Sequence, residues 1–121
     1  MEELINKIES QGWEVEAFDY SDGTGGLSIA QYSPAGEDFS FTINWYGSVE
    51  KAIKEIEDSA NDFDEGEHVA LWVEAKIQGN DFGKNIVCPS VRELVHDAEA
   101  IHNMLKDLAK FLINEYEIPL F

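Results

Sequence analysis

The spacing of apolar residues changes near residue 48, and this change limits what the chain can fold into. Before that point, four apolar residues alternate with polar ones: Phe39, Phe41, Ile43 and Trp45. This alternation is typical of a strand with one buried face. Beyond residue 48 the apolar residues recur at every third or fourth position, which is typical of helices. Strands followed by helices favour an α+β fold.

The first half of the chain predicts a short helix and three strands. Residues 2–11 have helical spacing, and Gly12 is a typical helix stop. The strands are expected at residues 13–17, 27–32 and 39–45. Turn-forming residues separate the strands at 21–26 and 33–38, and such short connections favour an antiparallel meander.

The middle of the chain predicts one clear helix and one ambiguous segment. Ser48 can cap a helix that reaches Phe63. In residues 64–77, Asp64 and Glu67 resemble the capping pair of a further helix. The apolar residues of the same segment also alternate with the period of a strand. We favour the helix and keep a fourth strand as the alternative.

The last third predicts a loop at 79–89 and then the longest helix. Ser90 and Glu93 form a capping box, and the helix is expected to reach about Asn114. The tail 115–121 is apolar enough to dock back on the body. The apolar face of the long helix is expected to comprise Val91, Leu94, Val95, Ala98, Ile101, Leu105, Leu108, Ala109 and Leu112.

A single α+β domain, residues 1–121, accounts for this pattern. A chain of 121 residues leaves little room for a second core. The only cysteine, Cys88, excludes an internal disulfide and suits a reducing compartment. The sequence has neither an apolar run of membrane-spanning length nor a signal-peptide pattern at its N-terminus. We therefore expect a soluble cytoplasmic protein.

The net charge of −17 comes from 25 acidic and 8 basic residues, and it is unevenly distributed. Residues 1–75 contain 18 acids and three bases, whereas residues 76–121 contain seven acids and five bases. Direct binding to nucleic acid or to an anionic membrane is not expected, because both would repel this chain. The densest acidic segment contains Glu55, Glu57, Asp58, Asp62, Asp64, Glu65 and Glu67.

These seven carboxylates have two interpretations. Glu55, Asp58 and Asp62 are spaced to share one solvated face of their helix, where like charges repel each other. One interpretation is a surface that keeps a small protein soluble and monomeric. The other is an anionic face that imitates the phosphate backbone and occupies a basic groove built for nucleic acid.

Other residue types form no pattern for catalysis or metal binding. His96 and His102 are six positions apart and do not share a helix face, and the histidines are expected to be exposed. No motif places a base beside Cys88 to activate it. The glycines at 23–26 lack the lysine and the helix N-terminus of a phosphate cradle. We expect no enzymatic activity, no metal site and no cofactor.

The aromatic residues are expected in two places. Trp13, Trp45 and Trp72 occupy core positions of their patterns. The outer face of the sheet, a credible partner surface, is expected to carry Tyr20, Tyr32, Tyr46, Glu14 and Glu16.

Segments 33–43, 62–69 and 89–101 together resemble a family of small acidic proteins of unknown function from phages and integrative elements of gut bacteria. The resemblance covers about residues 13–110 and carries no catalytic motif. It implies a helix for residues 64–76. It also implies a role in countering host defence, as anti-restriction and anti-CRISPR proteins of mobile elements do.

The sequence therefore predicts a non-enzymatic acidic binding protein. Its carboxylates from Glu55 to Glu67 would block a basic nucleic-acid-binding surface on a partner protein. The alternative is a mobile-element accessory or assembly module, in which helix 91–114 packs with a copy of itself or with a partner helix. Phe111 and Ile113 would widen the apolar stripe used for this contact. Both a monomer and a homodimer remain open.

Overall fold

A computed structural model describes residues 1–19, 25–77 and 90–118 of the chain. The elements are α1 (Glu2–Glu9), β1 (Glu14–Asp19), β2 (Gly25–Tyr32), β3 (Asp38–Trp45), α2 (Val49–Asp62), α3 (Glu65–Ile77) and α4 (Val91–Glu115). The predicted α+β class, with a short first helix, a three-stranded meander and a long last helix, is confirmed. The loop predicted at 79–89 lies outside the described residues.

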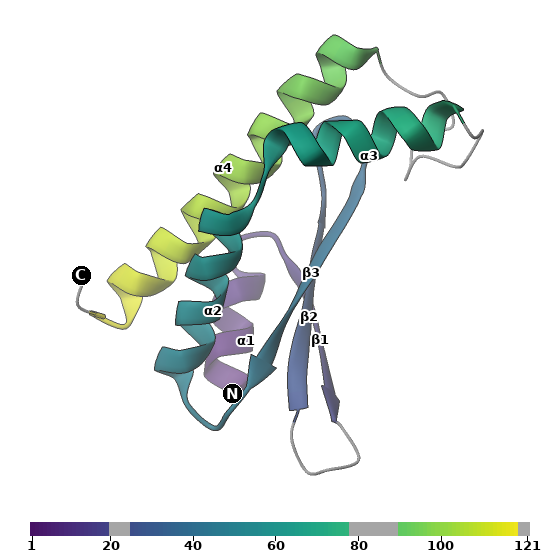
Figure 1. The fold of residues 1–121 in the computed structure, drawn as a ribbon. Helices are drawn as coiled ribbons and strands as arrows, with labels where there is room; N and C mark the ends of the chain where they lie inside the picture. The colour runs from purple at the N-terminus through teal and green to yellow at the C-terminus, as the bar shows by residue number, and fades with distance from the viewer. Residues whose placement is uncertain (20–24, 78–89, 119–121) are drawn as a thin grey trace.

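The three strands form one antiparallel sheet in the order β1-β2-β3 (Figure 1). The register places Ile29 of β2 between Val15 of β1 and Phe41 of β3. β2 begins at Gly25, two residues earlier than the predicted start. A Cβ atom at Gly26 would lie 2.6 Å from both the Ile43 backbone oxygen and the Phe18 ring, so glycine is needed at this point of the strand.

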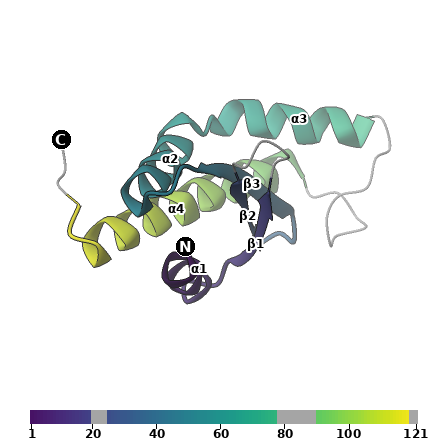
Figure 2. The same ribbon diagram turned by 90° about the horizontal axis from the view of Figure 1, so that it is seen from below.

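Helices α1, α2 and α4 lie on one side of the sheet, and α3 runs past its β3 side (Figure 2). The core between these helices and the sheet contains Leu4, Ile8, Leu27, Ile29, Ile53, Ile56, Ile101, Leu105, Leu108 and Leu112, all at most 1% exposed. No described helix covers the opposite face of the sheet. That face carries exposed side chains such as Glu14, Glu16, Ser40 and Thr42.

Residues 65–77 form a helix, which confirms the favoured of the two alternatives. The predicted cap is present, because Asp64 Oδ1 accepts a hydrogen bond of 3.0 Å from the backbone N–H of Glu67. The strand-like alternation is misleading because its members do not share one environment: Leu71 is 62% exposed, whereas Val69 and Val73 are partly buried.

The predicted apolar face of α4 is confirmed for Leu94 and from Ala98 to Leu112, and is wrong at Val91 and Val95. Val91 and Val95 are 55% and 41% exposed. The buried stripe is centred on Leu94 and its helical neighbours and extends to Asp97, which is 4% exposed. Val95 lies on the other flank of the helix and therefore faces solvent.

The C-terminal tail docks on the body as far as it is described. Tyr116 and Ile118 pack against the core, and residues 119–121 lie outside the described part. Among the described residues, no helix combines the length and the apolar character needed to cross a membrane.

Candidate functional site

Glu55 bonds to the sheet instead of sharing the solvated face that the sequence predicted. Its carboxylate accepts hydrogen bonds from the backbone N–H of Asn44 at 3.1 Å and from the Asn44 side-chain amide at 3.4 Å. β3 is an edge strand of the described sheet, and edge N–H groups invite pairing with other chains. The partly buried Glu55 therefore covers one edge donor and has a structural role.

Glu57 and Asp58 share one lysine of the same helix. Lys54 Nζ lies 2.9 Å from Asp58 Oδ1 and 3.6 Å from Glu57 Oε1. The hydrogen bond to Asp58 raises the pKa of the Lys54 ammonium above its ordinary value. All three groups are substantially exposed, so these ion pairs contribute little to stability.

The remaining acids of the segment lie where α2 ends and α3 begins. Asp64 caps α3, and Glu65 Oε1 lies 3.7 Å from His102 Nδ1. Asp62 and Glu67 are exposed. Four of the seven predicted carboxylates are thus exposed at the turn between the two helices (Figure 1), and we call them the acidic corner: Asp58, Asp62, Asp64 and Glu67.

Local stability explains only half of the acidic corner. Asp64 and Glu67 lie at the N-terminus of α3, where the helix dipole favours negative charge. Asp62 lies at the C-terminus of α2, where the dipole disfavours a carboxylate, and the last turn of α2 contains no base. Asp58 precedes Asp62 by four residues, so the two carboxylates also repel each other. The repulsion between Asp58 and Asp62 therefore opposes helix stability, and the contact of Lys54 with Asp58 offsets only part of it.

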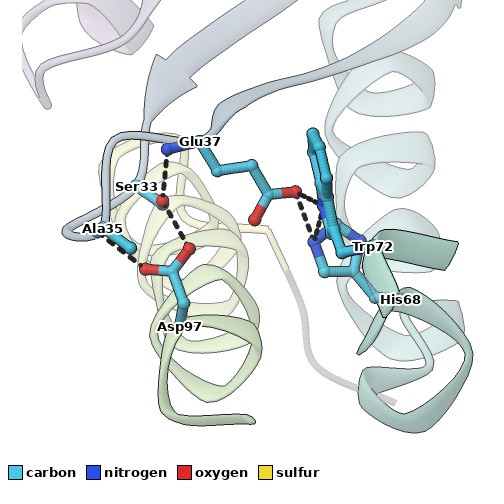
Figure 3. Close-up of polar contacts among 6 residues, drawn as sticks. All are labelled: Ser33, Ala35, Glu37, His68, Trp72 and Asp97. Atoms are coloured by element: carbon cyan, nitrogen blue, oxygen red, sulfur yellow. Dashed lines mark hydrogen bonds and ion pairs between the residues drawn. The ribbon is translucent and has the colours of Figure 1, made fainter. Parts of the chain in front are cut away.

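A buried polar network that the sequence did not predict lies where the β2–β3 turn meets α3 and α4 (Figure 3). Ser33, Glu37 and Asp97 are the buried polar side chains of the described residues, at 6%, 2% and 4% exposure. The Ser33 hydroxyl donates to Asp97 Oδ2 at 2.5 Å, and the backbone N–H of Ala35 donates to Oδ1 at 3.0 Å. Asp97 thereby holds the turn against α4.

Glu37 links the same turn to α3. Its backbone N–H donates to Ser33 Oγ at 2.9 Å, while its side chain extends to the neighbouring helix (Figure 3). Glu37 Oε1 lies 2.6 Å from His68 Nε2 and also accepts from Trp72 Nε1. The other oxygen, Oε2, is buried and has no hydrogen-bond partner. Trp72 Nε1 also lies 3.2 Å from His68 Nε2, so the two ring nitrogens and one oxygen of a buried carboxylate lie in mutual contact.

A cavity of about 410 Å³ lies beside this carboxylate, between the start of β3 and α3. Its walls combine two acids with aromatic rings. Phe39 and His68 are in edge contact, with ring centroids 6.2 Å apart. The cavity is lined by Glu37, Asp38, Phe39, Ser40, His68, Leu71 and Trp72. We call it the β3–α3 pocket.

The expectation of exposed histidines is correct only for His96, whose side chain is 71% exposed. The side chains of His68 and His102 are 15% and 18% exposed. His102 Nε2 lies 2.9 Å from the backbone oxygen of Ala60, and His68 contacts Glu37. These contacts bury both rings against neighbouring elements. Within the described residues no three His, Cys, Asp or Glu side chains converge as metal ligands, and Cys88 lies outside that part.

The predicted core position is confirmed for Trp13 and for Trp45, which packs against the core, and is wrong for Trp72, which lines the β3–α3 pocket. Trp13 is buried, Trp45 and Trp72 are partly buried, and Trp72 belongs to the polar network as well. Tyr32 and Tyr46 are exposed as expected, whereas Tyr20 lies outside the described residues.

The long helix uses its apolar face within the chain. Ile113 is buried, and Phe111 packs against the same core. The stripe on which the assembly-module alternative rests is therefore covered by the chain itself from Leu94 onward.

Sequence patterns contained one signal for the polar network. Asp97 lies three residues after Leu94 and four before Ile101, so an acid interrupts the apolar face of a helix. Glu37 gave no such signal, because it lies in a turn-rich segment. Comparison of the chain with protein-family models, curated proteins and solved structures gives no match.

Proposed function

We propose that the protein is a non-enzymatic acidic binding protein whose acidic corner occupies a basic, nucleic-acid-binding surface of a partner protein. The observation that carries this proposal is the Asp58–Asp62 pair. Asp62 is exposed at the unfavourable end of the α2 dipole and repels Asp58, and the contact of Asp58 with Lys54 offsets only part of this stability cost. Contact with cationic groups of a partner would reduce the repulsion between the two carboxylates, so the pair suits a binding surface.

Three further features support the same function. The acidic corner lies where α2 meets α3, whose N-terminus Asp64 caps, and both helices pack against α4, so the backbone that carries the carboxylates is fixed by the fold. The lysine in ion-pair contact with the corner is Lys54, which already contacts Glu57 and Asp58, while Lys106 and Lys110 of α4 line a hollow beside Glu57 and Asn61. The net charge of −17 would steer a basic partner over long range and accelerate encounter. The resemblance to small acidic proteins of mobile elements favours a partner in host defence, of anti-restriction or anti-CRISPR type.

The test is affinity capture from a bacterial lysate with two matched variants. The corner variant carries Asp58→Asn, Asp62→Asn, Asp64→Asn and Glu67→Gln, and asparagine at 64 can still cap α3. The control variant removes four exposed acids elsewhere, by Glu9→Gln, Glu50→Gln, Glu99→Gln and Asp107→Asn. Both variants lose four negative charges, so a difference between them reports position rather than net charge.

We expect the wild type and the control variant to retain a nucleic-acid-binding protein that high salt or added DNA releases. The corner variant should retain at least tenfold less of it. Equal capture by the two variants, or capture that neither salt nor DNA affects, would refute the proposal.

A further inference from the structure

The β3–α3 pocket has the chemistry of a receptor for one cationic group. Glu37 lines it with a carboxylate that is 2% exposed, and one of the two oxygens of this carboxylate has no hydrogen-bond partner. A carboxylate accepts hydrogen bonds at both oxygens, and an unpaired buried oxygen is costly. This oxygen is shielded from solvent, so a donor brought by a ligand reaches and satisfies it when the walls of the pocket move apart.

The other residues that line the pocket indicate the charge and the size of the ligand. Asp38, exposed at the rim, adds a second carboxylate, so an anionic ligand would be repelled. Phe39 and Trp72 add aromatic rings, which attract cations through their faces. A volume of about 410 Å³ lies at the small end for ligand sites and suits one side chain better than a large cofactor.

We infer that the pocket binds an arginine side chain of the basic partner. A guanidinium is planar, has five N–H donors that can serve the unpaired oxygen of Glu37 and the rim carboxylate of Asp38 together, and stacks on aromatic rings. A lysine ammonium offers a point charge and lacks the planar stacking surface. This inference rests on the proposed function for the source of the arginine, but its chemistry can be tested without a partner.

The position of the pocket agrees with this role. Glu67 of the acidic corner and Leu71 of the pocket are four residues apart on α3, so they are neighbours on one helix face. The acidic corner would attract a basic surface, and the adjoining pocket would anchor one side chain of it. Interfaces commonly derive most of their affinity from such buried anchors.

The test uses N-acetyl-arginine amide and its neutral isostere, the citrulline amide, added to the ¹⁵N-labelled protein. NMR detects the indole N–H of each tryptophan separately, and Trp72→Phe assigns the resonance from the pocket. We expect the arginine amide to shift the Trp72 resonance in a saturable manner and the citrulline amide to leave it in place. An equal response to both compounds, or none to arginine, would overturn the inference.

Two pocket variants and one control complete the experiment. Glu37→Gln removes the charge, and Ser40→Phe obstructs the rim from an exposed strand position without touching the Glu37 contacts. Each should weaken arginine binding at least tenfold, whereas Glu99→Gln, an exposed acid on α4, should not. Unchanged binding in a folded Ser40→Phe protein would contradict the inference even if Glu37→Gln fails to fold.

The same variants separate this inference from the proposed function. If Ser40→Phe captures the lysate partner as well as wild type does, the arginine anchor is wrong while the acidic corner stands. If the Trp72 resonance responds to arginine amide but the corner variant captures as wild type does, the proposed function fails alone.

Discussion

Replacing Asp97 by alanine should strongly destabilise the fold, although the residue is an acid on a helix. Asp97 is 4% exposed and accepts hydrogen bonds from the Ser33 hydroxyl and the Ala35 N–H. Alanine leaves the buried Ser33 hydroxyl and the partly buried Ala35 N–H without this acceptor, at about 1–3 kcal/mol for the first and less for the second. Relief of the buried carboxylate offsets part of this loss. We therefore expect the free energy of unfolding to fall by about 3 kcal/mol.

Urea unfolding followed by circular dichroism measures this change. With an m-value of about 2 kcal/mol/M, the midpoint should fall by roughly 1.5 M while m stays constant. Asp107→Ala is the matched control, because Asp107 is an exposed aspartate on the same helix. Its effect should stay within about 0.5 kcal/mol.

A double-mutant cycle with Ser33→Ala tests the mechanism behind the loss. Because the Ser33 hydroxyl donates directly to Asp97, the two effects should be non-additive by about 1 kcal/mol or more. The reasoning is refuted if Asp97→Ala changes stability no more than Asp107→Ala does. Strict additivity with Ser33→Ala would show that the hydrogen bond between them contributes nothing.

Three further changes test other parts of the fold. Ser90→Ala removes the acceptor of the Glu93 N–H and should cost about 1 kcal/mol in urea unfolding; an unchanged midpoint would show that this cap is dispensable. Leu105→Ala, at 1% exposure, should cost about 2–5 kcal/mol and lower Tm, and a loss below 1 kcal/mol would place this side chain outside the core. Burial raises the pKa of Tyr116, so the native state favours the protonated hydroxyl and loses stability as pH rises above about 10. In urea unfolding, Tyr116→Phe should lose less free energy of unfolding between pH 7 and 10.5 than the wild type does. An equal loss in both proteins would contradict the assignment to Tyr116.

Local sequence signals predicted the elements of the fold. The capping residues Ser48, Asp64 and Ser90 each accept the expected backbone hydrogen bond in the structure. Such signals succeed because a cap and the helix that it starts lie within a few residues of each other. The same local reasoning placed Val95 on a buried face, because periodicity gives the stripe but not its rotation about the helix axis.

The candidate site was predictable only as a stretch of acids. The sequence identified the acidic segment from Glu55 to Glu67 but not which of its carboxylates bond within the fold and which remain exposed. Glu55 covers an N–H of β3, whereas Asp62 remains exposed, and both have the same charge in the sequence. What separates them is the element that lies opposite each side chain, which periodicity does not contain.

The sequence by itself determined the fold class, the strand and helix order and the strong negative charge, because these depend on composition and on neighbours along the chain. Only the tertiary structure decided that the Ser33 hydroxyl donates a hydrogen bond to the Asp97 carboxylate, 64 positions away along the chain. It likewise decided that Glu37 meets His68 and Trp72 beside a pocket. Burial makes these polar groups depend on one another, and burial is a property of the packed chain rather than of any segment.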